Sequence, residues 1–244
     1  MIVIFVIQEN ERSVAMYDNN YSSVSLSEMD YLDVKNLAQT GEGTYLEFKR
    51  TIPSAFKIAR EIAAFANTRG GTLLIGVDDD CSLVGVAGYQ EEEYLLKKAA
   101  EELCRPKVDI AIEIVHFGER DLLVIKVPEL TEKPVFVKTE EGNIVFMREE
   151  DRNKVASKEL IEIIKKRNSD EGVTFEYGKN EQTLFRYLNE YGEITVKKFA
   201  HLVDIPRRKA SATLVNLVSA DILNLFRKKN TDYFTYSRKC ENEY

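Results

Sequence analysis

The chain has 244 residues, 44% of them apolar, and a formal net charge of -7 at pH 7. This length suits one or two domains with a sizeable core, and we expect two. Its three cysteines, Cys81, Cys104 and Cys240, are odd in number and lack Cys-x-x-Cys spacing, which excludes a disulfide framework and a zinc-finger site and favours the reducing cytoplasm.

Residues 1–28 form an N-terminal segment without a clear pattern. Its opening run, Met1–Ile7, is apolar, but a membrane helix needs roughly 20 such residues. The run also lacks a basic flank and a small-residue cleavage site. It therefore predicts an added strand, or a misassigned start, and no membrane partner is expected.

Strand and helix patterns alternate from Tyr45 onward. Leu46 and Phe48 alternate with charged residues, as in a strand with one buried face. Apolar residues then recur at helical spacing after Pro53, until Gly70-Gly71 ends the helix. The run Thr72–Val77 is almost wholly apolar and predicts a strand buried on both faces, with Asp78–Ser82 as its turn.

Several shorter elements follow. Leu83–Val86 predicts a returning strand, and Glu91–Cys104 predicts a helix. Two hairpins are expected, one across Gly118–Asp121 and one around Gly142-Asn143. Ser157 then caps a helix to about Arg167, and the polar residues 168–172 indicate a linker.

One long motif carries a resemblance. Glu42 and the run Glu47-Phe48-Lys49 are followed by Ala-Phe-Ala-Asn-Thr-Arg-Gly-Gly-Thr-Leu-Leu-Ile-Gly-Val-Asp-Asp at residues 64–79. This block resembles the Schlafen AlbA-type domain, which occurs in many bacterial transcriptional regulators and in animal Schlafen proteins. The likeness continues more weakly through Val145–Arg148 to about Arg167. Where family members often carry a Gly/Ser stretch, this chain has Glu149-Glu150-Asp151.

The resemblance implies an α/β (α+β) fold, with an AlbA-type mixed-sheet domain over residues 29–168. A second domain is expected over residues 173–244, where short helices precede two strands. This order is that of a winged helix-turn-helix. Its second motif helix would begin Pro206-Arg207-Arg208-Lys209, and its wing tip would be Arg227-Lys228-Lys229. The alternative is a module for dimerisation or protein contact with exposed lysines.

Charge is uneven along the chain. Residues 173–244 hold 12 Lys and Arg against 9 Asp and Glu, while the remainder holds 22 against 32. Any affinity for nucleic acid should therefore depend on the C-terminal segment.

Acidic residues in the first domain suggest a second chemistry. Gly41 and Gly43 would let Glu42 fold toward Glu47, and Asp78 or Asp79 ends the neighbouring buried strand. Three such carboxylates suit Mg²⁺ or Mn²⁺. In nuclease-active Schlafen proteins two glutamates and an aspartate at matching positions form the metal site, so the resemblance implies Glu42, Glu47 and Asp78 or Asp79 here. These acids could instead be solvated turn residues, in which case no cofactor is expected.

Polar residues around the glycine pair suggest a third possibility. Lys49, Arg50, Asn67, Thr68 and Arg69 would line a phosphate-contacting surface, with Gly70-Gly71 allowing close approach. Alternatively, Asn67 and the glycines only cap and pack the helix. The aromatic residues mostly fall at core spacing and do not indicate a base-stacking platform.

The sequence thus predicts a DNA-binding transcriptional regulator of the cytoplasm, acting on duplex DNA as a homodimer, with RNA as a further ligand. The alternative is a divalent-metal-dependent Schlafen-like endoribonuclease. In a third hypothesis, the first domain senses a small ligand or a partner.

Overall fold

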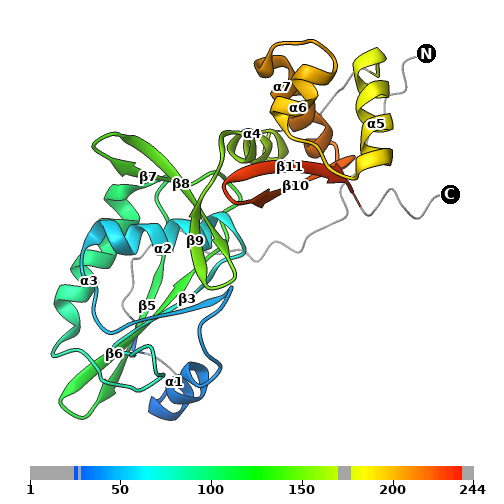
Figure 1. Cartoon of the computed structure of the whole chain (residues 1–244). Coiled ribbons are helices and arrows are strands. Elements are labelled where there is room, and N and C mark those ends of the chain that lie inside the picture. The colour runs from blue at the N-terminus through cyan, green and yellow to red at the C-terminus, as the bar shows by residue number, and fades with distance from the viewer. Residues whose placement is uncertain (1–24, 27–28, 170–176, 238–244) are drawn as a thin grey trace, which may run out of the picture. The chain divides into compact units, whose positions relative to one another are not determined.

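The computed structural model describes residues 25–26, 29–169 and 177–237, and the chain divides into two compact units between Ala156 and Ser157 (Figure 1). Helices and several sheets confirm the expected α+β class. The strand expected at Met1–Ile7 lies outside the described residues. None of the helices in the described ranges is long and apolar enough to span a membrane.

The N-terminal unit is built mainly of strands. Its helices are α1 (Tyr31–Ala38), α2 (Ala55–Asn67), α3 (Tyr89–Lys97) and the π-helical turn η1 (Lys98–Leu103). Its strands are β1 (Ser25–Leu26), β2 (Leu46–Lys49), β3 (Gly71–Ile75), β4 (Cys104–Arg105), β5 (Ala111–Phe117), β6 (Arg120–Val127), β7 (Phe136–Thr139), β8 (Gly142–Glu149) and β9 (Arg152–Val155).

These strands form two sheets. The first has the order β1-β5-β6-β3-β2, with β2 parallel to β3 and β1 parallel to β5. The second has the order β4-β7-β8-β9. The predicted buried strand, β3, is flanked by β2 and β6, and Leu73, Leu74 and Ile75 are fully buried. The prediction of a strand buried on both faces is confirmed.

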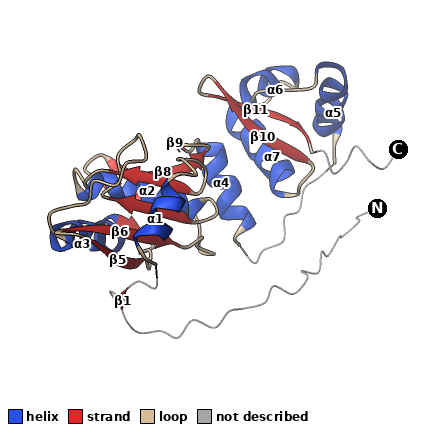
Figure 2. Ribbon diagram, turned by 90° about the horizontal axis from the view of Figure 1, so that it is seen from below, coloured by secondary structure: helices blue, strands red, loops and turns tan. Residues whose placement is uncertain are grey.

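Helix α2 lies between the two sheets, as both ribbon views show (Figures 1 and 2). Ser54 caps its N-terminus by accepting a hydrogen bond from the Lys57 N–H at 3.2 Å. Its apolar residues, including Ile62 and Phe65, pack against Leu73 of the first sheet and Phe146 of the second. The other face of the first sheet forms a smaller core with α1. A helix buried on two sides needs small residues, which explains the alanines of α2.

The C-terminal unit is mostly helical. Its elements are α4 (Lys158–Arg167), α5 (Lys179–Tyr191), α6 (Val196–Leu202), α7 (Arg207–Ser219), β10 (Leu223–Lys228) and β11 (Thr231–Tyr236). Its core joins Ile163 of α4 to Leu184, Phe199, Leu214 and Phe234. The sequence assigned helix α4 to the first domain. In the structure it groups with the C-terminal unit, because its buried residue, Ile163, packs in the core of that unit.

Several local expectations differ from the structure. Leu83–Val86 is not a strand and makes only isolated bridges, Val77 with Leu83 and Val86 with Asp121. In the first expected hairpin Phe117 pairs with Arg120, so its turn is tighter than Gly118–Asp121. In the second, Thr139 pairs with Gly142, so the turn is Glu140-Glu141 and the expected turn residues Gly142-Asn143 begin β8. In the wing hairpin Lys228 pairs with Thr231. Lys229 and Asn230 have φ values of 47° and 62° there, as a two-residue primed turn requires. Helix α1 and strand β9 were not predicted.

Candidate functional site

The segment before β2 folds back along the open edge of that strand. Gly41 adopts a φ of 79° and starts this turn. The Gly43 N–H donates to the Leu46 carbonyl at 2.9 Å, and the Phe48 N–H donates to Oε1 of Glu42 at 2.8 Å. Because β2 is the last strand of its sheet, these bonds satisfy edge groups that would otherwise be open. The Glu42 side chain is thereby held by a backbone N–H group of β2.

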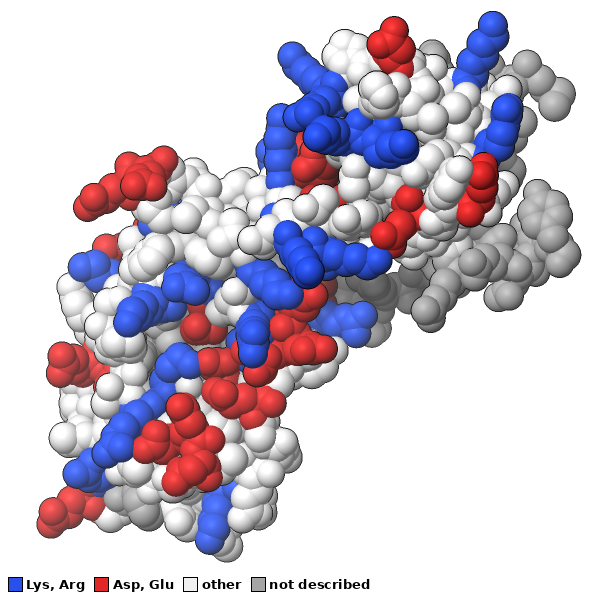
Figure 3. Space-filling model, viewed as in Figure 1, with Lys and Arg blue, Asp and Glu red and all other residues white. Residues whose placement is uncertain are grey.

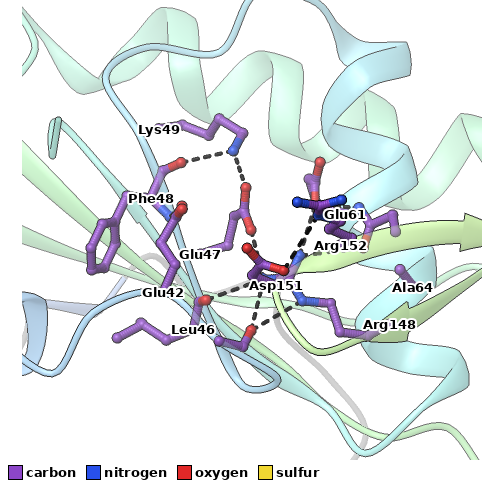
Figure 4. A network of polar contacts seen from close by, with 12 residues as sticks. Glu42, Leu46, Glu47, Phe48, Lys49, Glu61, Ala64, Arg148, Asp151 and Arg152 are labelled. Carbon is purple, nitrogen blue, oxygen red and sulfur yellow. Dashed lines mark hydrogen bonds and ion pairs between the residues drawn. The ribbon is translucent and has the colours of Figure 1, made fainter. Parts of the chain in front are cut away.

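Arg148 on β8 is the centre of a buried polar network (Figure 4). Its side chain is 1% exposed, and Nη2 lies 2.7 Å from Oε2 of Glu47. Nη2 also donates to the Gly43 carbonyl at 2.7 Å, and Nη1 donates to Oδ1 of Asn153 at 3.3 Å. The guanidinium lies 5.0 Å from the centre of the Phe65 ring. Arg148 thus ties β2 and its edge segment to β8, β9 and α2.

Glu47 is held between two cations. Lys49 donates to its Oε1, and Arg148 approaches its Oε2. Within the described residues Oε2 has no hydrogen bond of good geometry, although it lies 2.7 Å from Arg148 Nη2. We regard this contact as a charge pairing, because the guanidinium N–H groups are directed at carbonyl oxygens instead. Each carboxylate oxygen of Glu47 therefore lies next to a cationic side chain.

Glu61 on α2 is a second acid in this network, and it was not among the site residues predicted from the sequence. Its carboxylate lies 3.6 Å from Arg148 Nη1 and accepts a hydrogen bond from Asn153. Burial, followed by the nearby charge of Glu47, raises the pKa of Glu61. Position 61 falls on the apolar stripe of α2 with Ile58, Ile62 and Phe65. An acid on such a stripe was the signal that could have identified it.

The acids predicted to bind a metal do not converge. Asp78 pairs with Arg50 at 2.8 Å, and Asp79 is exposed. In the ranges that the structure describes, no group of three His, Cys, Asp or Glu is placed to hold a metal ion. Glu42 is bonded to a backbone N–H and Glu47 to two cations. Oxygens of Glu42, Glu47 and Asp78 are already engaged by a backbone N–H or by cations, so as they stand these three acids do not offer a shared site to Mg²⁺ or Mn²⁺.

The basic residues expected to form one phosphate surface lie at two ends of a strand pair. Lys49 is paired with Ile75 at the C-terminal ends of β2 and β3, where Arg50 also lies. Arg69 precedes β3, and its Nη1 donates to the Tyr45 hydroxyl at 3.3 Å. Four residues of strand separate the two ends by roughly 10–13 Å. Lys49 and Arg50 are moreover engaged by Glu47 and Asp78.

Asn67 and Thr68 are used within the fold. Nδ2 of Asn67 donates to the Val135 and Phe146 carbonyls at 2.8 and 2.9 Å, and its Oδ1 accepts from the Val135 N–H at 2.7 Å. Asn67 is 3% exposed. The Thr68 hydroxyl accepts from the Arg148 N–H at 3.0 Å. A structural role of Asn67 is therefore favoured over phosphate contact, since a buried, bonded amide cannot reach a ligand.

Basic side chains in the C-terminal unit are more accessible. Arg207, Arg208 and Lys209 form the first turn of α7 and are exposed. Among the described residues none of the three has an ion-pair or hydrogen-bond partner through its side chain. In Figure 3 basic side chains gather over the end of this unit that holds α6 and α7, whereas acids and bases are mixed on the N-terminal unit.

The hairpin bases are differently placed. Nε of Arg227 lies 3.4 Å from Oδ1 of its cross-strand neighbour Asp232, and Nζ of Lys228 lies 2.7 Å from Oε2 of Glu193. Lys229, in the turn, is exposed and has no ion pair with any described residue. Of the predicted wing-tip cluster, Lys229 is therefore the residue whose charge is least compensated.

Comparison with known proteins agrees with the N-terminal motif. Residues 42–157 match the family model described as Schlafen, AlbA_2. Among solved structures, the N-terminal domain of a RecG-related protein from Nitrosomonas europaea is similar at a TM-score of 0.39 and 23% identity, over 59% of this chain and 94% of that chain. The DIP2311 protein from Corynebacterium diphtheriae is similar at 0.38 and 18%, over 56% of this chain and 30% of that chain.

Proposed function

We propose that this chain is a DNA-binding transcriptional regulator whose C-terminal unit is a winged helix-turn-helix. In this proposal α5, α6 and α7 are its three helices and β10–β11 is its wing. The turn between α6 and α7 is short, because Asp204 adopts a φ of 51° and the Ile205 N–H donates to the Ala200 carbonyl at 3.0 Å. Helix α7 would be the recognition helix, which enters the major groove with its N-terminal residues near the bases.

The observation that carries the proposal is the first turn of α7. Three adjacent basic residues are exposed there without compensating acids among the described residues. Two contributions attract phosphate to this helix N-terminus. One is the charge of the uncompensated basic side chains, and the other is the positive potential of the helix dipole at that end. The wing turn adds Lys229. The AlbA_2 domain supports a nucleic-acid-related function in general.

Fluorescence anisotropy of a labelled duplex, titrated with the whole chain at several salt concentrations, tests the proposal. Replacing Arg207, Arg208 and Lys209 with alanine should weaken binding and reduce the slope of log affinity against log salt by about 0.9 for each phosphate that the variant no longer neutralises. A control with Lys57, Lys107 and Lys138 replaced by alanine removes the same charge from the N-terminal unit. Equal slopes for the two triple variants would contradict the proposal.

We further propose that the protein acts as a homodimer. One small module with few uncompensated basic residues should bind weakly, and regulators of this class usually place two modules roughly 34 Å apart on a two-fold symmetric site. Light scattering at tens of micromolar, with and without duplex DNA, should show a dimer. A monomer under both conditions would contradict this.

The nuclease alternative has no comparable support in the geometry of its acids. It is tested by incubating the chain with structured RNA, with and without Mn²⁺. Retention of duplex DNA without RNA cleavage agrees with the regulator. Manganese-dependent cleavage that is abolished by Glu47→Gln, at a temperature where this variant is folded, would favour the enzyme.

A further inference from the structure

Three tyrosines from two elements, α5 and β11, surround one hollow of the C-terminal unit. Tyr187 and Tyr191 come from α5, and Tyr233 comes from β11. The hollow has a volume of about 320 Å³, which is at the small end of the range for small-molecule sites. Lys198 of α6 and Glu193 complete its charged lining. From this hollow we infer that the C-terminal unit binds an unpaired nucleotide of single-stranded nucleic acid, with the base on the tyrosines and the phosphate at Lys198.

The rings of α5 present a stacking surface. Tyr187 and Tyr191 are four residues apart and face each other, with ring centres 4.5 Å apart and planes at 30°. Tyr191 is 58% exposed, so one side of this pair is open to a ligand. A base that stacks on Tyr191 would extend an existing aromatic pair. Such stacking accepts any base, because every base has a π-face.

The third ring, Tyr233, has contacts of its own that fix its position. Tyr233 stacks on Phe226 with ring centres 5.8 Å apart and planes at 18°. Nζ of Lys228 lies 5.3 Å from the Tyr233 ring and 2.7 Å from Glu193. These contacts hold Tyr233 in place and neutralise Glu193, which would otherwise repel a phosphate.

Lys198 supplies the charge that a phosphate needs. Its Nζ lies 5.6 Å from the centre of the Tyr187 ring. Across the described ranges no carboxylate pairs with it, in contrast to Lys228. Two lysines already lie over the rings, so a cationic guest such as a methylated lysine would meet like charge. Rings and an uncompensated ammonium together fit a nucleotide better.

This inference goes beyond duplex binding by α7, which needs none of these tyrosines. It is tested with a fluorescein-labelled 12-residue oligothymidine, which has no duplex structure, and with the whole chain. Tyr191→Ala should weaken oligothymidine binding roughly 5- to 150-fold, the range found when a stacking ring is removed. Tyr191→Phe should retain the affinity. Lys198→Ala should reduce the salt slope by about 0.7, the value for one phosphate of a single strand.

Tyr177→Ala is the matched control, because Tyr177 is 61% exposed on the same unit and outside the hollow. It should leave oligothymidine affinity within twofold. Tyr191→Ala should also leave the affinity for duplex DNA within twofold. The variant with Arg207, Arg208 and Lys209 replaced by alanine should instead bind duplex DNA more weakly. Absence of oligothymidine binding by the native chain, or equal effects of Tyr177→Ala and Tyr191→Ala, would overturn the inference. Binding of a trimethyllysine peptide at Tyr191 with no oligothymidine binding would also overturn it. Failure of duplex binding alone would affect only the proposal for α7.

Discussion

Nη2 of Arg148 lies 2.7 Å from Oε2 of Glu47, and the two side chains are 1% and 9% exposed. This buried pair connects the second sheet to the edge strand of the first. Charges so well shielded from water stabilise a fold only while both partners are present. The pair therefore explains why a glutamate with the spacing of a metal ligand is also a structural residue of this domain.

Glu47→Gln should destabilise the N-terminal unit by about 2–3 kcal/mol, because it leaves the Arg148 charge buried with weaker compensation. The loss of stability is measured by urea unfolding, with hydrogen exchange of the α2 amides as the probe of the N-terminal unit. Glu149→Gln is the control, since Glu149 and Lys154 form an exposed pair, 53% and 51% accessible. That change should cost no more than about 0.5 kcal/mol. Equal costs would show that the Arg148 network contributes little.

The network should also respond to pH. Burial and the charge of Glu47 raise the pKa of Glu61 above its ordinary value of 4.5. The folded state then binds this proton more readily than the unfolded state, so ionisation of Glu61 removes stability as pH rises from about 4.5 through the folded pKa. Glu61→Gln should therefore gain stability relative to the native chain as pH rises. A stability difference that is constant between pH 4 and 8 would contradict this.

Gly71→Ala should destabilise the fold by about 1–3 kcal/mol, as overpacking does. A Cβ at this position would lie 2.2 Å from Cδ1 of Phe65, whose ring is fully buried. At Gly43 a Cβ would meet no atom within 4 Å, so Gly43→Ala is the matched control. Thermal unfolding compares the two variants. A similar decrease in stability in both would indicate that backbone flexibility, rather than contact with Phe65, is responsible.

Asn67→Ala should cost about 2–5 kcal/mol, because it leaves three backbone groups of Val135 and Phe146 buried without their partner. DNA affinity measured at a temperature where the variant is folded should stay within twofold. Asn143→Ala, at an exposed position of β8, controls for removal of an asparagine. A specific decrease in DNA affinity in folded Asn67→Ala would restore the hypothesis of phosphate contact.

Lys229→Ala should reduce the salt slope of duplex binding by about 0.9, the value for one phosphate contact. Lys228→Ala should change the slope less, because Glu193 already compensates its charge at 2.7 Å. Anisotropy titrations from low to moderate salt separate the two variants. A larger effect of Lys228→Ala would mean that its ion pair opens when DNA binds.

The sequence by itself determined β2, α2 and β3 and the basic turn of α7. Alternation in β2, the apolar run of β3 and the helical spacing of α2 act over a few residues, so they can be read directly. Arg207, Arg208 and Lys209 are adjacent in the chain, and their cluster needs no folding to be seen. The AlbA_2 resemblance is likewise contained in one contiguous motif, and the family model matches it.

Only the tertiary structure decided which charges are compensated. Arg148 bonds to Gly43 at a separation of 105 residues, and Asn153 bonds to Glu61 at a separation of 92. Such contacts depend on how the two sheets pack around α2, which local patterns do not reveal. The same holds for the hollow of Tyr187, Tyr191 and Tyr233, whose residues look like core positions in the sequence. Side-chain pairing is set by packing between distant segments. It pairs Glu47 with Arg148 and Asp78 with Arg50, and among the described residues it leaves Lys198 without a carboxylate partner.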